Sequence, residues 1–141
     1  MVKVGNGSMI HIFTFLQLLL LGSLIAVSEG SIFSRPRRHV HIVNFLGYNI
    51  SLNVHCKSED IDLGFHDVSY GFKFDFEFLP KIIGKTSFFC DLKWQGKFHS
   101  ANVFNSRADS ERCAKNCYWS VESDQLCTWG DAGKEVCTPW K

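Results

Sequence analysis

The chain has almost no excess of charge of either sign. Its 141 residues contain 15 Lys and Arg against 14 Asp and Glu, so the formal net charge is +1. Proteins that bind nucleic acids do so through several clustered cations, whereas the one basic cluster here is Arg35, Arg37 and Arg38. The charge balance therefore argues against a nucleic-acid partner. The cluster is either a processing-protease site or a solvated tail.

The cysteine spacing lacks the pattern of a redox or zinc site. The sequence has no Cys-x-x-Cys pair, and no second close Cys or His pair accompanies Cys113 and Cys117. An even number of cysteines in a small exported chain instead implies disulfides, because the exported compartment is oxidising. The pairing stays open at this point, although Cys127 and Cys137 are suitably placed to close a terminal hairpin. The six cysteines are Cys56, Cys90, Cys113, Cys117, Cys127 and Cys137.

Long apolar segments are confined to the N-terminus. Residues 10–27 contain no Asp, Glu, Lys or Arg, follow Lys3 and end in small residues, which predicts a secretory signal peptide over residues 1–30. An uncleaved membrane anchor is the competing interpretation. We expect a basic N-terminal tail at 31–38, one domain at 39–141, no membrane insertion after cleavage and an extracellular location.

The domain has no internal repeat and no segment with helical periodicity. Instead, apolar residues alternate with polar ones, which is typical of strands with one buried face. Seven or eight short strands separated by turn residues predict an all-β fold, an antiparallel β-sandwich stapled by disulfides. The clearest strand is GFKFDFEF at 71–78. Its aromatic face consists of Phe72, Phe74, Phe76 and Phe78, which we expect to pack in the core because an open stripe of this size invites aggregation.

Several segments resemble the plant self-incompatibility protein family, also called the S-protein homologues. The resemblance covers nearly all of residues 39–124 and is most specific at His55-Cys56-Lys57-Ser58, at the Phe88, Cys90 and Trp94 spacing, and at Cys117-x-Trp119. The matching segments are VHIVN (40–44), LNVHCKSEDIDLG (52–64), GFKFDF (71–76), TSFFCDLKW (86–94), Phe98 and CAKNCYWSV (113–121).

The resemblance implies a small secreted plant protein with a β-sandwich fold. One branch of the family is the pistil determinant recognised by incompatible pollen in poppy. The resemblance also implies that Cys56, Cys90, Cys113 and Cys117 pair among themselves, which leaves Cys127 to pair with Cys137. We therefore expect a monomeric extracellular ligand that binds a plant cell-surface receptor, with no cofactor.

Surface loops are where specificity for a partner is expected. The loop SEDIDLG carries Glu59, Asp60 and Asp62, which are our candidates for a partner-binding loop. The alternatives for three neighbouring carboxylates are a calcium site and a solvated turn. Ile61 and Gln125 depart from the family pattern. The partner specificity of these two loop tips is therefore not inferred from relatives.

Five histidines lie in the domain, and they define the alternative functions. His39 and His41 share a face of one strand and are considered as metal ligands together with His55. A metal site, however, normally needs three or four ligands that are oriented by further hydrogen bonds. The rival class is a secreted hydrolase or toxin that uses His55, His66 or His99, with Lys57 near a phosphate. A protein inhibitor that acts through an edge strand is a third possibility. We expect no catalysis and no metal.

The motif Asn49-Ile50-Ser51 is an N-glycosylation sequon. It lies at the mouth of what we expect to be the first hairpin. A glycan on Asn49 points to solvent and masks one loop end.

Overall fold

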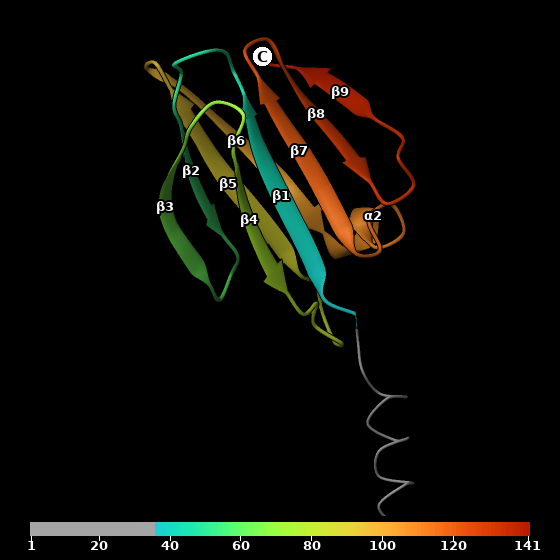
Figure 1. Cartoon of the computed structure of the whole chain (residues 1–141). Coiled ribbons are helices and arrows are strands. Elements are labelled where there is room, and N and C mark those ends of the chain that lie inside the picture. Colours follow the sequence, from blue (N-terminus) through green and yellow to red (C-terminus); the bar gives the residue numbers. More distant parts are fainter. Residues whose placement is uncertain (1–35) are drawn as a thin grey trace, which may run out of the picture. The chain divides into compact units, whose positions relative to one another are not determined.

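The computed structural model describes residues 36–141, so the predicted signal peptide and residues 31–35 of the predicted tail lie outside the described residues. The described part contains nine strands and one short helix (Figure 1). The first strand begins at Arg38, one residue before the expected start of the domain. In chain order the elements are β1 Arg38–Phe45, β2 Leu52–Lys57, β3 Asp62–Val68, β4 Lys73–Phe78, β5 Ser87–Trp94, β6 Lys97–Asn105, α2 Ser106–Asp109, β7 Asn116–Glu122, β8 Gln125–Gly130 and β9 Val136–Pro139.

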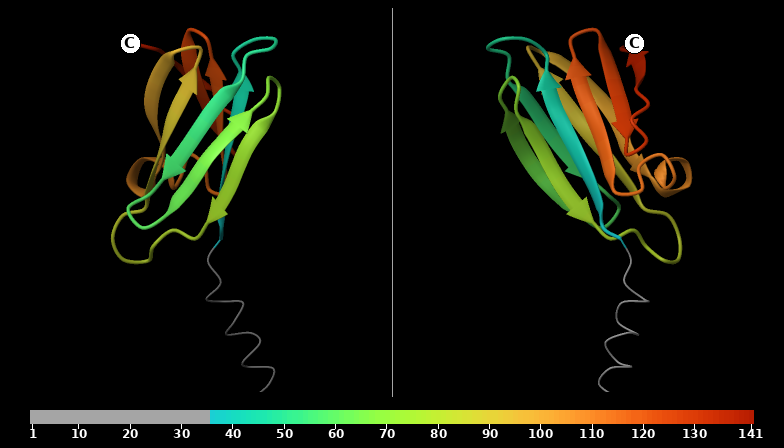
Figure 2. Two further views of the ribbon diagram at one scale, coloured as in Figure 1. Left: turned by 90° about the vertical axis from the view of Figure 1, so that its left-hand side faces the viewer. Right: turned by 45° about the vertical axis from the view of Figure 1, so that its right-hand side comes forward.

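The strands form two sheets that pack against each other (Figures 1 and 2). One sheet has the order β4-β1-β7-β8-β9 and the other has the order β3-β2-β5-β6. The predicted all-β sandwich is therefore confirmed. Among residues 36–141, no helix is long and apolar enough to cross a membrane.

Two details of the predicted topology are wrong. β1 pairs with β7 in parallel, whereas the predicted sandwich is antiparallel. A parallel pair is possible because a long stretch of chain, which includes the other sheet, connects the two strands. The expected first hairpin does not exist, since β1 and β2 belong to different sheets. Residues 46–51 carry the chain from one sheet to the other.

The core lies between the sheets and follows the alternation in the sequence. Phe88, Cys90, Leu92 and Trp94 alternate along β5 and are all buried, and so are alternate residues of β1 and β2. The fully buried side chains include Val40, Ile42, Leu52, Val54, Cys56, Cys90, Val103, Phe104 and Val121.

The phenylalanine face of β4 is buried at one end only. Phe78 is 7% exposed and its ring centroid lies 4.6 Å from that of Phe88. Phe74 and Phe76 are half-buried against the core. Phe72 is 69% exposed, so its predicted place in the core is wrong. It precedes the strand and belongs to the turn after β3, where its amide donates to the Ser69 carbonyl at 3.0 Å.

Three disulfides staple the domain. Cys56 and Cys90 face each other across β2 and β5, and Cys127 and Cys137 do so across β8 and β9. The bond between Cys113 and Cys117, the second residue of β7, closes a short loop that leads into this strand. As the family resemblance implies, the first four cysteines pair among themselves, and the structure decides which of them pair. The bond between Cys127 and Cys137 closes the terminal hairpin as expected.

We expect the three disulfides to differ in their contribution to stability. In the chain-entropy description, a crosslink destabilises the unfolded state more when it closes a longer loop. The sequence separations are 34, 10 and 4 residues for the bonds that begin at Cys56, Cys127 and Cys113. Replacing each pair by alanine should therefore lower the free energy of unfolding by about 4, about 3 and about 2 kcal/mol, respectively. Urea denaturation of the three double variants tests this order, and the largest loss at the Cys113–Cys117 bond would contradict it.

Asp131, in the turn after β8, holds the start of β7. Its carboxylate accepts hydrogen bonds from the backbone N–H groups of Lys115 at 2.7 Å and Asn116 at 3.1 Å. Partial loss of hydration acts to raise the pKa of this exposed carboxyl, but the hydrogen bonds from Lys115 and Asn116 outweigh it and hold the pKa below its ordinary value.

This depressed pKa predicts a loss of stability in acid. A carboxyl with a lower pKa in the folded state stabilises the fold fully above its ordinary pKa of 3.8, and that contribution disappears as the pH falls through the folded value. We expect Asp131→Asn to lose stability at neutral pH and to show a weaker fall in stability between about pH 5 and pH 2 than the unsubstituted protein. Urea denaturation across this range measures it, with the exposed Asp124→Asn as the control. An unchanged pH dependence in Asp131→Asn would refute the assignment.

Candidate functional site

The predicted acidic loop lies at one end of the sandwich, beside the loop between β4 and β5 (Figure 2). An ion pair joins the two loops, since Asp60 Oδ2 lies 2.9 Å from Lys81 Nζ. The hydrogen bond to Asp60 raises the pKa of Lys81. Glu59 is exposed beside this pair. Two of the three predicted carboxylates therefore lie on a surface that both loops build.

Asp62 is different, because its carboxylate is engaged within its own sheet. It is the first residue of β3. Its Oδ1 accepts a hydrogen bond from the Gly64 N–H at 2.8 Å and lies 2.6 Å from His55 Nε2. These two contacts, the first from Gly64 and the second from His55, lower the pKa of Asp62. Asp60 and Asp62 thus have different partners, and the three carboxylates do not converge on one point.

The two loops enclose a hollow of about 500 Å³. Phe78 at the end of β4 and Phe88 at the start of β5 lie at its base and are almost fully buried. The remaining lining comes from Lys57, Ser58, Glu59, Asp60, Ile61, Leu79, Lys81, Lys85, Thr86, Ser87 and Phe89. Sequence reasoning missed this hollow, because the segment LPKIIGK (79–85), which supplies part of its lining, has no strand alternation and no recognisable motif.

The histidines proposed for a hydrolase do not come together. His66 and His99 lie in one row across the second sheet, with Val54 and Leu92 between them, so about three strand spacings, or roughly 14 Å, separate their backbones. His55 follows Val54 and therefore projects from the opposite face.

Each of these histidines packs against an aromatic side chain. The His55 ring packs on Phe65, with centroids 4.1 Å apart. His66 stacks on Phe74 at 4.2 Å. His99 stacks on Trp140 at 4.3 Å and on Trp94 at 5.1 Å.

The other predicted histidine group is also divided. His39 and His41 stack on the outer face of β1, with ring centroids 6.3 Å apart, but His55 belongs to the other sheet. His41 lies 3.0 Å from Asn116 Oδ1 and 3.6 Å from Asp75 Oδ2, and stacks on Tyr118.

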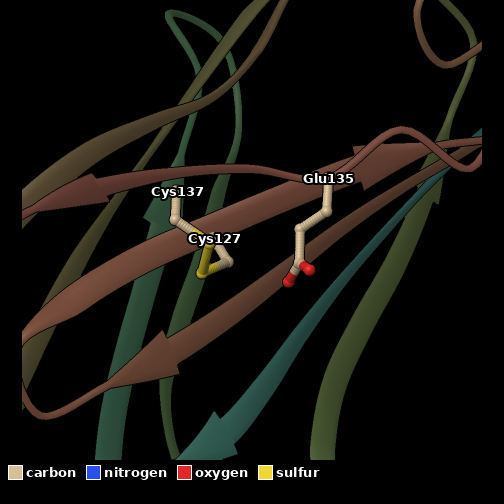
Figure 3. Close-up of side chains that lie close together, drawn as sticks. All are labelled: Cys127, Glu135 and Cys137. Atoms are coloured by element: carbon tan, nitrogen blue, oxygen red, sulfur yellow. A yellow bond between two sulfur atoms is a disulfide. The ribbon is translucent and has the colours of Figure 1, made fainter.

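Within residues 36–141, one group of three His, Cys, Asp or Glu side chains is close enough to share an ion: Cys127, Glu135 and Cys137. Figure 3 shows the two sulfur atoms bonded to each other, with Glu135 beside them. A disulfide offers no thiolate, which is the form of cysteine that binds metals. The group is therefore a structural crosslink beside an exposed carboxylate.

Asn49 lies exposed in the crossover loop, with a backbone φ of 62°. Because this loop connects the two sheets, the sequon is not at the mouth of a hairpin as expected. Its glycosylation stays a prediction.

Comparison with known proteins identifies the family. The sequence profile described as plant self-incompatibility protein S1 matches residues 39–140. S-protein homolog 2 of Arabidopsis thaliana is 33% identical over 119 residues, which cover 80% of this chain and 74% of the relative. S-protein homolog 5 of the same plant is 34% identical over 102 residues, covering 72% and 77%. Self-incompatibility protein S1 of Papaver rhoeas is 32% identical over 114 residues, covering 79% and 80%.

A solved structure supports the fold. It is described as that of an SPH (self-incompatibility protein homologue), from a widespread family of small, highly stable, secreted plant proteins. The match has a TM-score of 0.59 at 18% sequence identity and covers 77% of this chain and 98% of the other. The two-sheet architecture, the profile match and the relatives agree, and this chain belongs to the plant self-incompatibility protein S1 family.

Proposed function

We propose that this protein acts outside the cell as a recognition ligand that binds a plant cell-surface receptor through its surface loops. The observation that carries the proposal is the pair of loops joined by Asp60 and Lys81. They present exposed charged side chains on a disulfide-stapled scaffold, and charged groups of this kind set the specificity of an encounter between proteins. Membership in a family that includes the poppy self-incompatibility protein supports the same role.

The arrangement of the histidines supports binding over catalysis. Proton transfer by a histidine requires it to lie within hydrogen-bond reach of the reacting group, together with its catalytic partners. His55 and His66 project from opposite faces of their sheet, and His99 lies at the far edge. A hydrolase that needs two of these side chains at one bond is therefore the less favoured function.

Reversing the charge of the loop should weaken binding to cells. We expect Glu59→Lys with Asp60→Lys to reduce the binding of fluorescently labelled protein to plant protoplasts or pollen tubes about tenfold or more, because like charges then meet across the interface. Saturation binding on intact cells measures the effect. The matched control is Glu111→Lys with Asp124→Lys, which makes the same change of charge at exposed positions elsewhere.

Equal binding by both double variants would contradict the assignment of the loop. A further comparison addresses the hydrolase. If His66→Ala with His99→Ala abolishes a hydrolytic activity while the protein stays folded and its cell binding is unchanged, the catalytic function replaces the one proposed here.

A further inference from the structure

The hollow between the two loops has an apolar interior. Phe88 and Phe78 at its base are 2% and 7% exposed, and Ile61, Leu79 and Phe89 form walls that are 41–49% exposed. Its volume of about 500 Å³ falls within the range of small-molecule sites, which are mostly apolar with a few convergent polar groups.

The ion pair between Asp60 and Lys81 ties the walls together. These residues come from the β2–β3 loop and the β4–β5 loop, respectively, and their contact of 2.9 Å fixes the distance between the loops at one point. The charges of Asp60 and Lys81 also neutralise each other. The charge of the hollow is therefore set by its other lining residues.

Those remaining residues leave an excess of positive charge. Lys57 and Lys85 line the hollow together with Glu59 as the one unpaired carboxylate. Among residues 36–141, no carboxylate lies within ion-pairing distance of Lys57 or Lys85. An ammonium group beside an apolar surface forms its strongest contacts with an anion.

We propose that this hollow binds a small amphipathic carboxylate of the fatty-acid type. The tail packs on Phe78, Phe88 and the apolar walls, and the carboxylate accepts hydrogen bonds from Lys57 and Lys85. This site does not depend on the proposed receptor function, because it needs only the groups of this chain.

The test is a titration of the oxidised, secreted protein with dodecanoate below its critical micelle concentration. We expect saturable ¹H–¹⁵N shift changes confined to the amides of residues 57–61 and 79–89. Dodecyltrimethylammonium has the same tail with the opposite charge, and we expect it to bind about tenfold or more weakly, since it forms no charge-assisted hydrogen bonds with lysine.

Variants test the charged part and the apolar part of the site separately. Lys57→Gln with Lys85→Gln should weaken dodecanoate binding about tenfold, whereas Lys93→Gln with Lys97→Gln, at exposed positions on β5 and β6, should leave it unchanged. Ile61→Asp should abolish binding. Its control is Val136→Asp on β9, a residue of nearly equal exposure (50% against 49%), and circular dichroism confirms that each variant is folded.

Three results would overturn the proposal: no saturable shift with dodecanoate, equal affinity for the cationic probe, or shifts centred away from the two loops. None of them bears on receptor binding. Conversely, the charge reversal of Glu59 and Asp60 tests receptor binding. The dodecanoate titration of the Lys57→Gln with Lys85→Gln variant tests the hollow, and its result does not depend on cell binding.

Discussion

Substitution of Asn44 by leucine is expected to lower the free energy of unfolding by about 3–5 kcal/mol, because it leaves buried backbone groups without hydrogen bonds. The Asn44 side chain is completely buried. Its amide nitrogen donates to the carbonyls of Ile50 at 2.7 Å and Val68 at 2.8 Å, and its Oδ1 accepts from the Leu46 N–H at 2.9 Å.

These three hydrogen bonds explain why the loss is so large. They hold the crossover loop and the end of β3 against β1, so a single side chain connects three segments. Leucine has a similar size but offers no polar atom, and water has little access to a fully buried position. Each backbone group left unsatisfied costs about 1–3 kcal/mol.

A surface asparagine supplies the control for Asn44. Asn53 on β2 donates one exposed hydrogen bond, to Asp67 Oδ1 at 2.9 Å, and we expect Asn53→Leu to change the free energy of unfolding by less than about 1 kcal/mol. Urea denaturation measures both variants. Similar losses of unfolding free energy in the two variants would contradict the stabilising role assigned to the buried hydrogen bonds of Asn44.

Alanine in place of Gly130 is the second substitution with a large expected effect. A Cβ atom at this position would collide with the backbone oxygen of Arg112 and lie 3.1 Å from the Cα of Cys113. Both are backbone atoms, so the clash is not relieved by rotating a side chain. We expect a loss of about 3 kcal/mol or more, at the upper end of what overpacking costs.

The segment that Gly130 contacts has little freedom to move. Cys113 is bonded to Cys117, and the Arg112 side chain pairs with Asp109 at 2.9 Å and donates to Thr128 Oγ1 at 3.0 Å. A shift that accommodates the methyl group would have to break some of these contacts.

Gly133 provides the matched glycine control. It lies in the following turn with φ +78°, and a Cβ there meets no atom within 4 Å. Gly133→Ala should therefore cost only the backbone strain, about 1 kcal/mol. Thermal unfolding and urea denaturation compare the two variants, and a loss at Gly130 no greater than that at Gly133 would contradict the steric argument.

The burial pattern was largely predictable because side-chain direction in a strand is a local property. Phe88 and Leu92 on β5 are buried as their alternation predicts. The prediction failed at Phe72, where a turn ends the alternation one residue before β4 begins. Asn44 occupies an inward position on β1, and nothing in its neighbours indicated that a polar residue there would find three partners.

The proposed binding surface was predicted only in part. Glu59 and Asp60 were identified as loop residues, and the structure places both beside the β4–β5 loop. The hollow that they line also needs Phe78 and Phe88, which come from different sheets. Lys81, the partner of Asp60, had no predicted role.

What the sequence determined by itself is what neighbouring residues decide: the strand type, the inward and outward faces and the number of cysteines available for crosslinks. The tertiary structure alone decided that β1 lies parallel to β7, that Asn44 connects three segments and that two loops enclose a charged-rimmed hollow. The physical reason is that backbone geometry alternates side chains residue by residue. Pairing between distant strands depends instead on the packing of the whole core, which no local pattern encodes.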